Sequence, residues 1–348
     1  MRAAGRAIAI RSPSAPIGIR AATLVTLAVA LPLCVAYATL VGAVAIEPHR
    51  VLAALFGGGQ GTDAIIVREL RLPRVIAAAL VGGSLAVAGT LLQGLLRNPL
   101  ADPFVTGTSA GGSLGLVLLL AFGGAAATPF LPVAAFAGAL LATTLVWRLA
   151  GLGGRTTVLT VLLAGVVLSS FAGGVVTFLM VASDRLALRL RSILDVLIGG
   201  VSIRSAGELT ITAAIVALGV LAAIALGPRL DAYAFGEETA ATLGVDTERT
   251  TVAVLAAVAL LAGTAVALAG LVGFVGLVVP HALRPLVGAP HRLLALACFL
   301  GGASCLVLAD AGARVVLAPT ELPVGVITGL VGGPFFLALL VRTRRMAV

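Results

Sequence analysis

Long apolar runs alternate with short polar turns along most of the chain. Many of the runs are close to 20 residues long, which is the length that an α-helix needs to cross a bilayer. The runs lie near residues 21–46, 73–96, 104–122, 129–150, 157–182, 207–227, 250–270, 272–287, 293–312 and 323–341. This pattern predicts an all-α integral membrane protein with about ten transmembrane helices.

The apolar stretch 250–287 is too long for a single crossing. At about 1.5 Å per residue it would extend roughly 57 Å, nearly twice the thickness of the hydrocarbon core. Its glycines cluster in "AGLVGFVG" (269–276), where we expect the helix to break and the chain to turn back. The expected organisation is a single ten-helix domain over residues 21–342, with cytoplasmic tails at 1–20 and 343–348.

Composition and charge support this membrane interpretation. Hydrophobic residues make up 60% of the chain and charged residues 11%, and the mean hydropathy is +1.18. The 23 basic residues are all Arg, giving a net charge of +9. A basic chain could bind nucleic acid, but Arg concentrated in cytoplasmic turns explains the charge better. The first 20 residues and "RTRR" (342–345) place both termini in the cytoplasm, and we expect no nucleic-acid partner.

Residues for catalysis are not grouped along the sequence. The chain has no Lys, so it cannot form the P-loop that binds nucleotide phosphates. His49, His281 and His291 are scattered, and no acidic residues stand at metal-ligand spacing. We therefore expect a transport subunit that is not an enzyme and holds no metal or cofactor. A proton-coupled secondary transporter is the alternative, and Asp310 would be its intramembrane carboxyl; an interfacial Asp near Arg314 is the favoured interpretation.

The segment "LGPRLDAYAFGEETAATLGVDTER" (226–249) is the longest cytoplasmic connection. Asp231 and Glu237 suggest the starts of short helical stretches, and Gly244 suggests an end. Such a helix–turn–helix, with Tyr233, Phe235 and Leu243, would fit a groove on a cytoplasmic partner. The alternative is a solvated loop that only links two spans.

Two further polar segments stand out. "VRELRLPR" (67–74) places Arg68, Arg71 and Arg74 at the outer mouth of the second span. These residues suit either the docking of an acidic partner or simple anchoring at the membrane interface. "LLRNPLADPFVTGTSAGG" (95–112) is a markedly polar turn between two apolar runs, and it contains the only Asn of the chain.

Several long motifs, in order along the chain, resemble the FecCD permease family. "RLPRVIAAALVGGSLAVAGTLLQGLLRNPLADPFVTGTSAGGSLG" (71–115) is similar to its signature, and "FGEETAATLGV" (235–245) to its coupling segment. "ALAGLVGFVGLVVPHALRPLVG" (267–288), "LADAGAR" (308–314) and "ELPVGVITGLVGGPFF" (321–336) resemble its C-terminal half. The resemblance covers about residues 20–342. Members are membrane subunits of bacterial ABC importers for ferric siderophores, haem and vitamin B12.

The resemblance implies a type II ABC importer permease in the bacterial inner membrane. It would pair with a second permease subunit, as a homo- or heterodimer surrounded by membrane lipid. Two cytoplasmic ATPase subunits would bind ATP and Mg, and a periplasmic or lipid-anchored binding protein would deliver cargo. We expect a ferric siderophore first, then haem, then cobalamin.

The resemblance also implies roles for individual residues. Arg71, Arg74 and Arg314 would dock the binding protein, and Asn98 and Leu100 would form the cytoplasmic gate. A second gate layer stays open among Thr157, Val158 and Leu159. Coupling to the ATPase falls in segment 228–249, and the residues assigned to it are Asp231, Tyr233, Phe235, Gly236, Glu237, Ala240, Leu243 and Gly244.

Overall fold

The computed structural model describes residues 16–58, 61–123, 130–152, 158–183, 198–201, 203 and 205–345. This part of the chain consists of helices joined by turns. Seven helices within this part are long and apolar enough to cross a membrane, and three shorter apolar helices accompany them. The all-α prediction with about ten helices is confirmed. The long and the shorter apolar helices of the described part are α1 (Ile17–Leu40), α4 (Leu72–Leu96), α5 (Thr108–Phe122), α6 (Leu131–Gly151), α7 (Val158–Ala182), α10 (Ala206–Tyr233), α12 (Thr247–Ala269), α13 (Val275–Val287), α14 (His291–Ala313) and α15 (Val324–Arg345).

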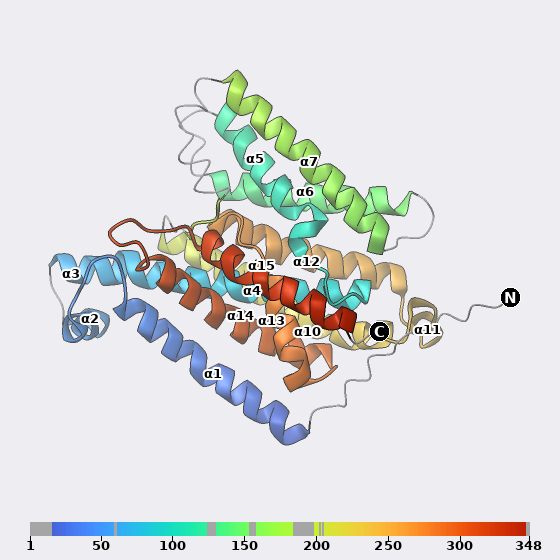
Figure 1. The fold of residues 1–348 in the computed structure, drawn as a ribbon, viewed down its shortest axis with the longest axis horizontal. Helices are drawn as coiled ribbons and strands as arrows, with labels where there is room; N and C mark the ends of the chain where they lie inside the picture. The colour runs from blue at the N-terminus through green and yellow to red at the C-terminus, as the bar shows by residue number, and fades with distance from the viewer. Residues whose placement is uncertain are drawn as a thin grey trace.

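Helix α4 is the central element of the fold. It packs against α10, α12, α13 and α14, and most of its residues are buried (Figure 1). Small residues allow these close contacts, because a Cβ on Gly82 would lie 2.2 Å from the carbonyl oxygen of Gly302 on α14. Two buried polar side chains of α4 are satisfied within the helix, because Ser84 and Thr90 each donate a hydrogen bond to the carbonyl oxygen four residues earlier.

The predicted break within 269–276 lies between α12 and α13. Helix α12 ends at Ala269, and Gly270 follows with a φ of 60°. Phe274 adopts the left-handed conformation immediately before α13 begins. Five residues outside the helices (270–274) therefore separate α12 from α13, and the predicted position of the break is confirmed.

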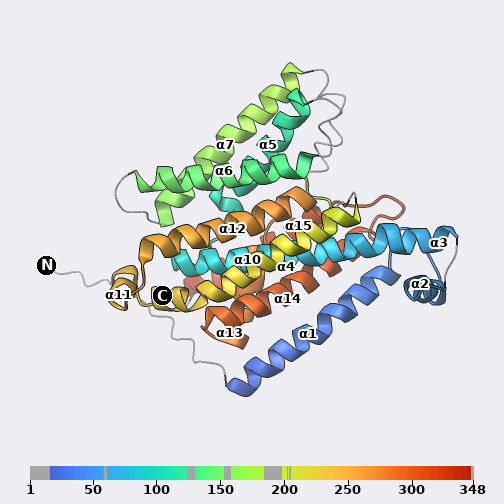
Figure 2. The same ribbon diagram turned by 180° about the vertical axis from the view of Figure 1, so that it is seen from behind.

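The two ends of the bundle carry different short helices. Helix α11 (Glu237–Thr242) lies at the same end as the start of α1 and the end of α15 (Figures 1 and 2). Helices α2 (Pro48–Leu55) and α3 (Thr62–Ile65) lie at the opposite end. The π-helical turn η1 (Ile66–Arg71) connects α3 to α4. If the end with α11 faces the cytoplasm, the start of α1 and the end of α15 face it too.

Three helices extend further than predicted. Helix α1 begins at Ile17 and α15 continues to Arg345, so both include residues that were expected in tails. Helix α10 continues through Pro228 to Tyr233. Proline removes the N–H that would bond to the carbonyl four residues earlier, Ile224. Arg292 of α14 donates its Nε–H to that carbonyl at 3.2 Å instead, which satisfies the group left free by Pro228.

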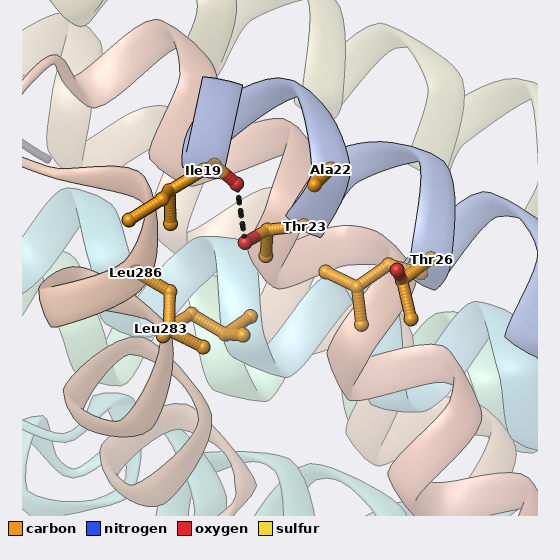
Figure 3. Close-up of a pocket in the computed structure, with 7 residues that line it drawn as sticks. Ile19, Ala22, Thr23, Thr26, Leu283 and Leu286 are labelled. Atoms are coloured by element: carbon orange, nitrogen blue, oxygen red, sulfur yellow. Dashed lines mark hydrogen bonds between the residues drawn. The ribbon is translucent and has the colours of Figure 1, made fainter. Parts of the chain in front are cut away.

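A shallow groove of about 330 Å³ runs between α1 and α13. Its walls are mainly apolar, from Ile19, Leu27, Leu283 and Leu286, and the hydroxyl of Thr23 is turned back onto the carbonyl of Ile19 (Figure 3). The groove lies at the periphery of the bundle, where α1 is largely exposed.

Candidate functional site: an outer arginine cluster, a polar turn and a protruding helix

Arg71 closes the end of the first span. Its side chain is 6% exposed and donates hydrogen bonds to the carbonyl oxygens of Thr39 at 3.3 Å and Leu40 at 3.1 Å, and to that of Val44. These carbonyls lie at or just beyond the C-terminal end of α1, where helical partners are missing. Arg71 therefore ties the outer end of α1 to the start of α4.

Arg314 makes a matching connection from α14. Its guanidinium donates to the carbonyl oxygens of Ala38 at 2.8 Å and Val41 at 2.9 Å. Its Nε lies 3.1 Å from Asp310, whose side chain is fully buried. Together, Arg71 and Arg314 supply donors to the last turn of α1, where the helix dipole also favours a cation.

Arg74 is the most exposed arginine of the cluster. Its side chain is 24% exposed and lies 3.0 Å from Asp310 and 2.5 Å from Glu321. Asp310 is thus paired with two guanidinium groups, from Arg74 and Arg314. We call Arg71, Arg74, Asp310, Arg314 and Glu321 the outer cluster.

The arginines of the outer cluster have partners within the chain. Arg71 and Arg314 bond to carbonyl oxygens at the end of α1, and their expected role in docking a binding protein stays a prediction. Asp310, the carboxyl that a proton-coupled transporter would use, is occupied by two guanidinium groups. The structure therefore gives Asp310 the interfacial, arginine-paired position that the sequence favoured.

The polar turn 97–102 lies at the end of α4, on the side of the bundle that carries α11. Arg97 adopts the left-handed conformation, with a φ of 50°. Asn98 accepts a hydrogen bond from the backbone N–H of Leu100 at 3.0 Å, which holds the turn in a compact form. Asn98 and Leu100 are both half-buried. Their expected role as a gate stays a prediction.

Asp102 ends this turn as a buried carboxyl group. It is 5% exposed and caps the short helix η2 (Pro103–Thr106), where it accepts the N–H of Phe104 at 2.7 Å. Burial raises the pKa of the Asp102 carboxyl to about 6, against the opposing effect of this hydrogen bond. The carboxyl therefore titrates near neutral pH.

Gln93 is a site residue that the sequence analysis missed. Its amide nitrogen donates to the carbonyl oxygens of Ala101 at 3.4 Å and Gly276 at 3.3 Å, so it joins the polar turn to the start of α13. Its oxygen accepts a hydrogen bond from Arg284 at 3.3 Å. The signal was available, because Gln93 is the one amide within a long apolar run.

The segment 234–246 protrudes from the bundle around α11. Phe235 and Leu243 are 76% and 65% exposed, while Ala240, a residue of α11 itself, is fully buried. Gly236, at the start of α11, has a φ of 110°, and Gly244 follows its end with a φ of 84°. The predicted short helix is present over Glu237–Thr242, and the residues that flank it, Phe235 and Leu243, expose large apolar side chains to solvent.

Asp231 and Tyr233 differ from the expectation. Both lie in the last turn of α10 instead of in a separate short helix. Tyr233 is 2% exposed, and its hydroxyl donates to the carbonyl oxygen of Thr247 at 2.8 Å and contacts Thr251 at 3.2 Å. Its side chain therefore fixes α10 to α12 and does not face a groove on another protein.

Two of the three residues considered for a second gate layer lie in the described part of the chain. Thr157 lies outside the described residues, whereas Val158 begins α7 and Leu159 is 65% exposed. Over the described segments, no group of three or more His, Cys, Asp or Glu side chains is placed to hold a metal ion.

Comparison with known proteins places this geometry in context. A model of the FecCD transport family matches residues 29–342. The vitamin B12 import system permease protein BtuC of Vibrio cholerae is 42% identical over 90% of this chain and 91% of its own length. The hemin transport system permease protein HmuU of Yersinia pestis is 38% identical over 79% of this chain and 83% of its own.

A solved structure has the same arrangement of helices. It is described as an inward-facing conformation of a metal-chelate type ABC transporter, and it superimposes with a TM-score of 0.78. The match covers 92% of this chain and 99% of that chain, at 27% sequence identity. The likeness therefore extends over nearly the whole length of both proteins.

Proposed function

The chain belongs to the FecCD transport family and is the permease subunit of an ABC importer for vitamin B12, haem or a siderophore, and from this premise we propose how it works. It receives a metal chelate from an external binding protein and releases it into the cytoplasm of a bacterial cell. Separate ATPase subunits bind ATP and Mg²⁺ and drive the movement. A ferric siderophore is the first cargo to test, followed by haem and cobalamin.

The position of α11 is the observation that carries this proposal. Phe235 and Leu243, which flank this helix, are exposed to solvent at the same end of the bundle as the polar turn. Arg97 in that turn comes close to Gly236 at the start of α11, because its Nη1 would lie 3.7 Å from a Cβ on Gly236. A subunit that pushes on α11 would act next to the turn that closes the pathway.

The coupling segment therefore divides into two groups of residues. Phe235, Glu237 and Leu243 would contact the ATPase, with Gly236 and Gly244 shaping the ends of the helix. Asp231, Tyr233 and Ala240 would anchor the segment to the bundle. Asn98 and Leu100, beside it, would close the cytoplasmic mouth until ATP binds.

Docking of the binding protein would use the outer cluster. Arg74 is the arginine that an acidic partner can reach, because it is partly exposed and paired with the exposed Glu321. Arg71 and Arg314 would support the docking face from below by holding the end of α1. Arginine suits this role because its guanidinium binds carboxylates in a bidentate manner.

The experiment that tests the function is uptake into proteoliposomes. Vesicles containing this chain with its ATPase are supplied with labelled ferric siderophore, haem or cobalamin, with and without internal ATP and external binding protein. We expect ATP-dependent uptake of one cargo, which falls by about tenfold or more in Arg74→Glu because a carboxylate repels an acidic partner.

Arg50→Glu is the matched control for this charge reversal. Arg50 lies at the same end of the bundle and is exposed, but it is outside the cluster. Uptake that needs no ATP and follows a pH gradient would contradict the proposal and favour a proton-coupled transporter. Equal losses in Arg50→Glu and Arg74→Glu would contradict docking through the outer cluster.

A further inference from the structure

His291 joins two helices at the end of the bundle that carries α11. It is the first residue of α14, and its Nδ1 lies 2.7 Å from the Oδ1 of Asp231 in the last turn of α10. The same carboxylate oxygen accepts the backbone N–H of His291 at 2.9 Å. Because a carboxylate only accepts hydrogen bonds, Nδ1 carries a proton. This contact joins residues that are 60 positions apart in the sequence.

The opposite edge of the imidazole faces α4. His291 is 5% exposed, and its Nε2 is buried without a hydrogen-bond partner. A Cβ on Gly94 would lie 2.6 Å from this Nε2, so the ring occupies the space that any other residue at position 94 would fill. Gly94 lies three residues before Arg97 and the polar turn. The imidazole therefore touches α4 just before the polar turn.

A buried polar atom without a partner needs an explanation. Leaving such a group unpaired destabilises the folded state, whereas an apolar side chain would fill the same space without that loss. Packing alone therefore does not account for a histidine here. The imidazole of His291 is distinctive because one edge is hydrogen-bonded to Asp231 while the other edge lies against Gly94.

The polar turn is also touched by the start of the coupling segment. Arg97 lies beside Gly236, and Asp231 lies five residues before Gly236. The end of α10 and the start of α11 thus reach the end of α4 through His291 and Arg97, in addition to the direct packing of Leu230 of α10 beside Gly94. A displacement of this segment is transmitted to α4 at these points, because packed interiors transmit strain.

We propose that His291 is a positioning residue that transmits movement of the coupling segment to the polar turn, through its bond to Asp231 and its contact with Gly94. The inference rests on the proposed function, since it assumes that the ATPase acts on α11. His291 touches no cargo. It holds the end of α10 at a fixed distance from the end of α4, so that the two helix ends move together.

His291→Asn is the variant that separates the two contacts. The amide of Asn can replace Nδ1 in the bond to Asp231, but it lacks the ring edge that reaches Gly94. Complexes with the ATPase and binding protein are compared in proteoliposomes. Relative to wild type, we expect uptake per ATP hydrolysed to fall by about fivefold or more, while ATP hydrolysis stays within about twofold. His49→Asn, at the opposite end of the bundle, is the matched control.

A second variant distinguishes transmission from packing. In Gly94→Ala/His291→Ala, the new Cβ at position 94 enters the space that the imidazole leaves, and its next neighbour is Leu230 at 3.4 Å. One methyl group fills part of the space that the imidazole leaves, and the bridge to Asp231 is absent. We expect this variant to hydrolyse ATP and to remain uncoupled. Uptake per ATP equal to wild type would overturn the proposal.

A readout that needs no cargo keeps the inference separate from the proposed function. Leu100→Cys is introduced after the three native cysteines are replaced by alanine, and its labelling by a membrane-impermeant maleimide is followed with and without ATP. We expect ATP to change the labelling rate in the wild-type background and to leave it unchanged with His291→Asn. If ATP changes the labelling rate equally in both backgrounds, the inference is overturned. It is also overturned if every His291 variant loses ATP hydrolysis and assembly.

Discussion

Asp102 is a buried carboxyl group in the turn that links α4 to η2, and its ionisation depends on the fold. Below about pH 4 the carboxyl is protonated in the folded and unfolded chains alike, and its contribution to stability is fully present. Burial raises the pKa of Asp102 from 3.8 to about 6. As the pH rises from about 4 to above 6, the unfolded chain releases the proton first. The free energy of unfolding therefore falls by up to roughly 3 kcal/mol.

Asp102→Asn tests this dependence, because Asn still accepts the N–H of Phe104 but does not ionise. We expect the variant to melt several degrees above the wild type at pH 8 and at the same temperature near pH 4. Thermal unfolding in detergent, followed by circular dichroism across this range, measures the difference. Asp246→Asn is the control, since Asp246 also caps a helix but is exposed. A pH-independent difference for Asp102→Asn would contradict the assignment.

The outer end of α1 is held by arginines from two other helices. Arg71 and Arg314 reach five carbonyl oxygens at or near its C-terminus, which are those of Ala38, Thr39, Leu40, Val41 and Val44. Few residues of α1 are buried, so little apolar packing replaces these hydrogen bonds. The attachment of α1 at this end therefore depends on side chains of η1 and on the residue that follows α14.

Arg314→Gln is expected to destabilise the protein markedly. Breaking a buried ion pair by removing one partner costs about 3–5 kcal/mol, and Asp310 would keep only Arg74. Arg50→Gln is the matched control, because Arg50 pairs with Glu47 and Asp63 at an exposed site, where a pair contributes about 0–1 kcal/mol. Melting temperatures in detergent compare the two. A smaller loss for Arg314→Gln than for Arg50→Gln would contradict this role.

The whole molecule exposes apolar faces on α7 and α15. Val167, Phe171 and Phe178 of α7 are at least 65% exposed, as are Leu330 and Val331 of α15. Lipid can cover such faces, but the same helices also carry glycines with open space around them. No heavy atom lies within 4 Å of a Cβ placed on Gly173, Gly174 or Gly333. Open glycines allow another helix to approach closely, which favours a second permease subunit at these faces.

Gly333→Leu tests this interface. A Cβ at this position has no other part of the described chain within 4 Å, so we expect the variant to fold normally but to shift from dimer towards monomer, because the bulk separates the two subunits. Chromatography with light scattering, corrected for bound detergent, gives the mass. Ala22→Leu, on the exposed surface of α1, is the control. A Gly333→Leu variant that stays as dimeric as Ala22→Leu would place the interface elsewhere.

The sequence by itself determined the positions of the apolar helices and of the break between α12 and α13. Span length and apolar content are local properties, so the runs could be counted and the glycine-rich break at 269–276 located without knowing any neighbours. The short helix α11 was also predictable, from its glycines and acidic residues. The motifs further indicated the family and the expected sites, including Arg71, Arg74 and Arg314.

Only the tertiary structure decided which side chains meet. Helix α10 continues through Pro228 because Arg292, from another helix, bonds to the carbonyl that proline leaves free. Arg71 and Arg314 find their partners on α1, and His291 finds Asp231. Hydropathy contains no information on these pairs, because they depend on the depth and rotation at which distant helices pack. That packing register is a property of the assembled bundle and not of any single segment.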